Sequence, residues 1–296
     1  MGKIFEALEK AGHETEQDFT SDDAHSRSDR ERAARQPKAV KVAKPVPPSV
    51  PPETPQKAAV HAFIKDDLDP DLICYFKPQS YEAEKIKVLR TSILFPEQGT
   101  PPRSILVTSA FPGEGKTFIA SNLAISIAQG IEEHVLLMDC DMRRSSVHSR
   151  FGFGSVPGLA EYLAKGTPID SLLLKSTVPK LSILPGGRNV HNPAELLSSR
   201  RMANLIDELS ARYPDRYVII DSPPPLLTAE ANAIARQVDG IVLVVKYGQT
   251  PRKAVVDMMD DLSREKIVGV ALNWVAADAM KYYGYSGNYR HYYDQS

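Results

Sequence analysis

The ten residues SAFPGEGKTF, at positions 109–118, place glycines, a lysine and a threonine at the spacing of a phosphate-binding loop. Gly113 and Gly115 allow backbone N–H groups to come close to phosphate oxygens, and a helix that starts there adds the positive end of its dipole. Lys116 would neutralise the β- and γ-phosphates, and the Thr117 hydroxyl would bind Mg²⁺. Ala110 replaces the first glycine of the pattern, and a residue this small still allows the turn. The loop therefore predicts a site for ATP and Mg²⁺, with candidate nucleotide contacts at Gly113, Glu114, Gly115, Lys116, Thr117 and Phe118.

Three aspartates follow apolar runs elsewhere in the chain. Asp139 and Asp141 lie in LLMDCD, and Asp221 ends YVIID. Ligands of open parallel sheets bind beyond the carboxyl ends of the strands, which is where these acids would lie. Mg²⁺ takes one or two carboxylates in such sites, so a third acid is free to act as a base toward an incoming hydroxyl. The three acids are thus enough for a magnesium site with one acid left over that can act as a base.

The elements that must position these residues alternate between two patterns. Short runs rich in Val, Ile and Leu predict strands over 104–109, 134–139, 181–185, 217–221, 240–245 and 267–273. Helical patterns lie between several of them, at 116–129, 193–212 and 251–265. This alternation predicts an α/β fold, with a doubly wound, mainly parallel sheet of the P-loop NTPase kind and helices on both faces.

The rest of the chain divides by composition. Residues 1–12 predict a short amphipathic helix, either a fraying terminus or a docking element for a partner, and residues 13–77 predict a disordered, proline-rich linker. The folded domain is expected over 78–276, and 277–296 is expected to be a flexible tail. A net charge of −1 gives no pull toward nucleic acid, and two cysteines suit a reducing compartment. No apolar run approaches the ~18–20 residues of a membrane span, so a soluble cytoplasmic protein is expected.

Four stretches of the chain follow the motifs of one known family: the phosphate loop, LLMDCDMRRSSVHSRFGFGSVPGLAEYL, YVIIDSPPP and PGGRNVHNPAELLSS. Over roughly residues 78–275 the chain resembles the bacterial tyrosine kinases of polysaccharide export. The resemblance implies a protein-tyrosine autokinase that uses Mg-ATP, with Lys116 and Asp139 as catalytic residues and Asp139 as the base. It also implies that Thr117, Asp141 and Asp221 hold Mg²⁺. Such kinases work with an inner-membrane polysaccharide co-polymerase; here that activator would be a separate chain that recruits the kinase to the inner face of the membrane.

The family also implies a ring of protomers packed through a helix with the pattern E-x-x-R-x-x-R. This chain has Glu84, Lys87 and Arg90 at those positions, so lysine replaces the first arginine. Lysine keeps the charge but lacks the planar fork that bridges carboxylates, and ring assembly is expected to be weaker or differently tuned.

The C-terminal segment decides between two functions. Its tyrosines lie in a stretch without core-forming aliphatic residues. They are predicted to be phosphate acceptors that enter a neighbour's active site: Tyr282, Tyr283, Tyr285, Tyr289, Tyr292 and Tyr293. The alternative is a partitioning-type ATPase that switches conformation and phosphorylates no protein. Such ATPases carry an extra lysine where this chain has Phe111, so autophosphorylation in trans is favoured. Asn273, at the end of the last expected strand, is a candidate contact for adenine, and Trp274 is expected in the core or a pocket wall.

Overall fold

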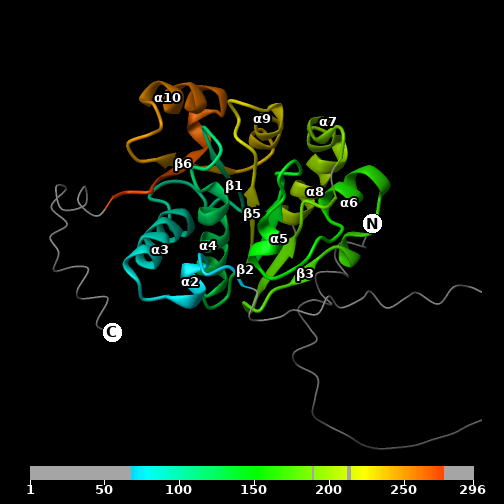
Figure 1. Ribbon diagram of the computed structural model, residues 1–296, viewed down its shortest axis with the longest axis horizontal. Helices are drawn as coiled ribbons and strands as arrows, with labels where there is room; N and C mark the ends of the chain where they lie inside the picture. Colours follow the sequence, from blue (N-terminus) through cyan, green and yellow to red (C-terminus); the bar gives the residue numbers. More distant parts are fainter. Residues whose placement is uncertain (1–67, 189, 212–214, 277–296) are drawn as a thin grey trace, which may run out of the picture.

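The computed structural model describes residues 68–188, 190–211 and 215–276, and these form a seven-stranded sheet between two layers of helices (Figure 1). The strand order is β3-β4-β2-β5-β1-β6-β7. All neighbours are parallel except β3 and β4, which pair antiparallel. The strands are β1 (Ser104–Ser109), β2 (His134–Asp139), β3 (Leu174–Lys175), β4 (Leu181–Leu184), β5 (Arg216–Asp221), β6 (Gly240–Lys246) and β7 (Ile267–Asn273). The predicted fold class is confirmed.

One face of the sheet is covered by α2 (Ile73–Phe76), α3 (Tyr81–Leu94) and α4 (Lys116–Ala128), and α5 (Val147–Arg150) packs at its margin. The other face is covered by α6 (Leu159–Lys165), α7 (Pro193–Leu197), α8 (Arg200–Ala211), α9 (Ala229–Ala235) and α10 (Arg252–Asp261). Two short 3₁₀ turns, η2 (Ile169–Ser171) and η3 (Arg264–Lys266), complete the described elements. Both faces of the central strands are therefore buried, which explains their continuous apolar sequences.

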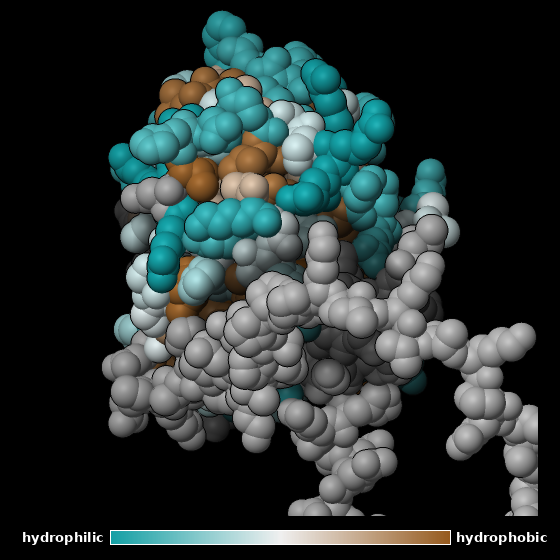
Figure 2. Space-filling model, turned by 90° about the vertical axis from the view of Figure 1, so that its right-hand side faces the viewer, coloured by the Kyte–Doolittle hydropathy of each residue, from teal (hydrophilic) through white to brown (hydrophobic). Residues whose placement is uncertain are grey.

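The helical pattern over 193–212 is divided into α7 and α8 rather than forming one helix. The Ser198 hydroxyl donates to the Ala194 carbonyl, and Ser199 Oγ accepts from the Met202 backbone N–H. Serine side chains compete in this way for backbone groups that a continuous helix would use. Within α8, Met202 and Leu205 face the core. The side of the molecule on the right of Figure 1, where α6 and α7 lie, is mostly hydrophilic among the described residues, with apolar patches between polar side chains (Figure 2).

Residues 68–77, here called the strap, were expected in the linker, but the structure places them in the folded domain. Leu72 and Cys74 are buried, and Leu68 forms a bridge to Phe151. Asn122 of α4 accepts from the Cys74 N–H at 2.9 Å and donates to the Asp71 carbonyl at 2.9 Å. A four-residue helix has too few turns to show a periodic pattern, which is why the boundary was set about ten residues too late.

The expected helix at 1–12, most of the linker and the tail at 277–296 lie outside the described residues. Among the helices that the structure does describe, none combines the length and the apolar character needed to cross a bilayer.

Candidate active site

The phosphate loop connects the end of β1 to the start of α4, at the carboxyl edge of the parallel strands. Gly113 and Gly115 both adopt left-handed backbone conformations, with φ of 81° and 94°. Gly115 is the N-cap of α4, and Lys116 and Thr117 are its first two residues. The first N–H groups of a helix have no partner within it and attract anions, so the loop has the backbone form of a phosphate site.

Two of the six predicted nucleotide contacts turn their side chains elsewhere. The Glu114 side chain is buried, and its carboxylate accepts from the Phe111 N–H at 2.9 Å and from the Thr250 hydroxyl. Phe118, a residue of α4, is partly buried and packs against the hydrophobic core. These residues can therefore reach a nucleotide only through their backbone N–H groups.

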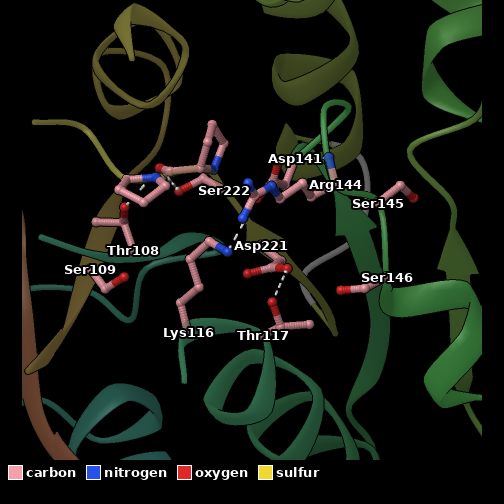
Figure 3. A network of polar contacts seen from close by, with 12 residues as sticks. Thr108, Ser109, Lys116, Thr117, Asp141, Arg144, Ser145, Ser146, Asp221 and Ser222 are labelled. Atoms are coloured by element: carbon pink, nitrogen blue, oxygen red, sulfur yellow. Dashed lines mark hydrogen bonds and ion pairs between the residues drawn. The ribbon is translucent and has the colours of Figure 1, made fainter. Parts of the chain in front are cut away.

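Four of the predicted polar side chains meet beside the loop (Figure 3). Lys116 Nζ lies 3.2 Å from Asp141 Oδ2, and Thr117 Oγ1 donates to Asp221 Oδ2 at 2.7 Å. Both acids are almost fully buried, at 6% and 1% exposure. The structure thus joins the start of α4 to the ends of β2 and β5 through one ion pair and one charged hydrogen bond.

Asp139, the last residue of β2, anchors the loop that follows this strand. Its Oδ1 accepts from the Asp141 N–H, and its Oδ2 accepts from the Ser145 hydroxyl at 2.8 Å. The backbone N–H groups of Ser146 and Val147 donate to the same oxygen. Burial, and to a smaller degree the charge of Asp221, raise the pKa of Asp139 to about 7, against the opposing effect of these hydrogen bonds. No motif in the sequence predicts Ser145 as a partner of Asp139.

Asp221 has one oxygen that fits a further ligand. Burial raises its pKa to about 6, while Lys116 and the Thr117 hydroxyl act in the opposite direction. Its Oδ1 is buried and has no hydrogen-bond partner among the described residues. Such an orphaned acceptor beside a threonine hydroxyl matches the oxygen ligands of Mg²⁺. No group of three or more His, Cys, Asp or Glu side chains in the described part of the chain could hold a metal, so the remaining ligands would have to be water or substrate oxygens.

Two arginines follow Asp141 on the rim of the site. Arg143 Nε lies 2.8 Å from Oε1 of Glu230, a buried residue of α9, while the arginine itself remains 58% exposed. The Arg144 backbone N–H donates to Asp141 Oδ1 at 3.1 Å. Glu230 was not predicted from the sequence, and no motif marks it.

The remaining candidates lie at the edges of the site or away from it. Asn273 donates its side-chain amide to the Glu114 carbonyl, and Trp274 is 63% exposed rather than in the core. On α3, Lys87 pairs with Glu84 at 2.6 Å, and Arg90 donates to the Ser126 carbonyl at 2.9 Å. The tail tyrosines lie outside the described residues.

Comparison with known proteins shows which proteins this chain is similar to. A family model described as an AAA domain matches residues 103–264. The chain is 35% identical to the tyrosine-protein kinase YwqD of Bacillus subtilis, over 73% of this chain and 91% of that kinase. It is 33% identical to the tyrosine-protein kinase Wzc of Salmonella typhimurium over 75% of this chain, but spans only 31% of that longer protein.

Solved structures agree with these relatives. The kinase domain of the Escherichia coli tyrosine kinase ETK superimposes with a TM-score of 0.64 at 29% identity, covering 71% of this chain and 84% of that domain. The chimerical protein CapA2B2 gives a TM-score of 0.63 at 31% identity, covering 70% of this chain and 92% of that one.

Proposed function

The chain belongs to the bacterial tyrosine kinase family and is a tyrosine-protein kinase with a P-loop domain, and on that premise we propose that it transfers phosphate from Mg-ATP to its own C-terminal tyrosines. The observation that carries the proposal is the meeting of Lys116 with Asp141 and of Thr117 with Asp221 at the phosphate loop. A lysine and backbone N–H groups bind the phosphates, and buried acids lie next to them.

The chain's own residues take separate roles in this reaction. Lys116 and the N–H groups of Gly113 to Phe118 hold the phosphates of ATP in place. Thr117, Asp141 and Asp221 would hold Mg²⁺, which neutralises charge on the phosphates when bound. Asp139 is the proposed base, and a pKa near 7 suits a group that accepts a proton at neutral pH. Its Oδ1 accepts one hydrogen bond, from the Asp141 N–H, so a lone pair of this oxygen is left for the proton of the tyrosine hydroxyl.

The proposed acceptors are Tyr282, Tyr283, Tyr285, Tyr289, Tyr292 and Tyr293. The segment that carries them follows β7, whose last residue, Asn273, contacts the phosphate loop. Tyr282 lies nine positions after Asn273, which is up to about 30 Å of extended chain. The acceptors can therefore reach a site close to their own domain. We propose that they enter the neighbour's site, in a ring that forms through Glu84, Lys87 and Arg90 of α3.

The wider function proposed is control of exopolysaccharide or capsule polymerisation and export. Each phosphotyrosine adds roughly −1.5 to −2 charges, so neighbouring tails repel one another and the ring loosens. The activator would be an inner-membrane polysaccharide co-polymerase, present as a separate chain, that brings this cytoplasmic kinase to the membrane. The predicted helix at 1–12 would dock on it, and replacing Phe5 and Leu8 by aspartate should then abolish their co-purification.

The proposal is tested by intact mass of the full chain, measured after phosphatase treatment and again after Mg-ATP. We expect added steps of one phosphate, absent from Lys116→Met and from a chain that ends at Lys281. Steady ATP hydrolysis without added mass, even in the presence of the activator's cytoplasmic segment, would instead identify a partitioning-type switch.

The direction of transfer needs a mixture of two variants. The full-length Lys116→Met chain supplies acceptors without activity, and the active chain that ends at Lys281 supplies activity without acceptors. Phosphate on the Lys116→Met chain shows transfer in trans. If only the unmixed wild-type chain gains phosphate, at a rate per molecule independent of its concentration, transfer occurs within one chain.

A further inference from the structure

Glu114 lies within the phosphate loop, yet its side chain is only 3% exposed. One carboxylate oxygen accepts from the Phe111 N–H at 2.9 Å, and the other accepts from the Thr250 hydroxyl. A carboxylate that faced the bound phosphates would repel them. The contact with Thr250 turns this charge away from the phosphates and ties the loop to a distant part of the chain.

The Thr250 hydroxyl is itself held in one orientation. It accepts from the Lys246 N–H at 3.0 Å, so its own hydrogen is available for Glu114. The backbone N–H groups of Gln249 and Thr250 both donate to the Lys246 carbonyl, which makes the turn after β6 tight. Thr250 therefore contacts Glu114 from a well-fixed position in the turn that follows β6.

Asn273 holds the same loop residue from the neighbouring strand. Its side-chain amide donates to the Glu114 carbonyl at 2.9 Å, and its own carbonyl accepts from the Tyr247 N–H at 2.9 Å. The C=O and N–H of a trans peptide point in opposite directions. Fixing the Glu114 carbonyl therefore aims the Gly115 N–H away from Asn273. A Cβ at position 115 would lie 2.1 Å from the Asn273 amide nitrogen, so the contact also requires glycine there.

From these contacts we infer that Thr250 and Asn273 are positioning residues for nucleotide binding. Together with Glu114 they form a clamp that fixes the phosphate loop in its binding shape before ATP arrives. Neither residue follows a phosphate-loop pattern, and their side chains act through Glu114 rather than on the nucleotide. The inference rests on the proposed use of ATP and names further residues that this use depends on. A preformed site has less conformational entropy to lose on binding, so the clamp should increase affinity for nucleotide.

The test is the affinity of the full chain for Mg-ADP, measured by isothermal titration calorimetry. Thr250→Val keeps the shape and removes the hydroxyl, and we expect about tenfold weaker binding, as for loss of one hydrogen bond to a charged group. Thr250→Ser keeps the hydroxyl and should bind within about twofold of the unaltered chain. Asn273→Asp, which cannot donate to the Glu114 carbonyl, should weaken binding as Thr250→Val does. The KM for ATP should rise with little change in kcat, because the lost contact acts before the chemical step.

Thr91→Val is the matched control. It removes a threonine hydroxyl that donates to the Lys87 carbonyl on α3, outside the clamp. Unchanged affinity in Thr250→Val and in Asn273→Asp would overturn the inference, as would equal losses in Thr250→Val, Thr250→Ser and the control. If the unaltered chain itself fails to bind Mg-ADP, the proposed use of ATP fails, and that result is distinct from failure of the clamp.

Discussion

Replacing Asn122 by leucine removes the side chain that fastens the strap to α4. Asn122 is fully buried, accepts from the Cys74 N–H, and donates to the carbonyls of Asp71 and Phe118. Leucine has a similar size but offers no polar atom. The Cys74 N–H then loses its asparagine partner in a buried position, whereas the Asp71 carbonyl, on an exposed residue, loses a partner that water can replace.

The cost follows mainly from the Cys74 N–H. A buried backbone group left without a partner costs about 1–3 kcal/mol, and the partly buried Asp71 carbonyl adds less. Detachment of the strap would relieve this cost, but it would expose Leu72 and Cys74, which are 1% exposed in the structure. We expect a net loss of about 2 kcal/mol, a fall in Tm of roughly 4–8 °C for a domain of this size.

Differential scanning calorimetry measures the fall, and limited proteolysis shows whether the strap detaches. Asn204→Leu is the matched control, because Asn204 lies exposed on α8 and the same replacement there should change Tm little. A fall below about 2 °C in Asn122→Leu, with no new cleavage within 68–77, would refute the reasoning that these hydrogen bonds fasten the strap.

Three further outcomes are expected. Gly115→Ala should abolish Mg-ADP binding in calorimetry, because a Cβ there meets the Asn273 amide nitrogen at 2.1 Å and the backbone has a φ of 94°. The control Gly154→Ala should bind Mg-ADP normally, because no atom lies within 4 Å of the added Cβ. Cys74 and Cys140 should resist iodoacetamide at pH 8 in the folded chain, because burial raises the pKa of both thiols, that of Cys74 to about 12; fast labelling of either by mass spectrometry would contradict this. Lys87→Arg should increase the assembled fraction in sedimentation velocity, since arginine bridges carboxylates with two hydrogen bonds, and an unchanged distribution would count against α3 as the ring contact.

The parts of the fold that the sequence predicted are those set by local pattern. The apolar runs that became β1, β2, β5 and β6 are buried on both faces, so their side chains had no reason to alternate. Asp139 and Asp221 end two of these strands, and the rule that ligands lie at the carboxyl ends of parallel strands placed them beside the phosphate loop. Glycine, lysine and threonine at fixed spacing then identified the loop itself.

What the sequence could not predict depends on pairs of residues far apart in the chain. Glu114 and Thr250 are separated by 136 positions, and Cys74 and Asn122 by 48. A lone threonine or asparagine has many ordinary uses, so neither type of residue signals a particular partner. The strap was missed for the same reason: its place in the domain is set by contacts with α4 and α5, and its own pattern is too short to read.

The strap also bears on the electrostatics of the active site. Asp69 pairs with Arg150 at 2.7 Å, and the Asp69 N–H donates to the Arg150 carbonyl. Burial raises the pKa of Asp221, and Arg150 is among the charges that lower it, after Lys116 and Thr117. Asp69 therefore holds in place a cation that favours the ionised form of Asp221. The segment that joins the linker to the domain thus contacts both the helix that begins at the phosphate loop and an arginine whose charge reaches a proposed magnesium ligand.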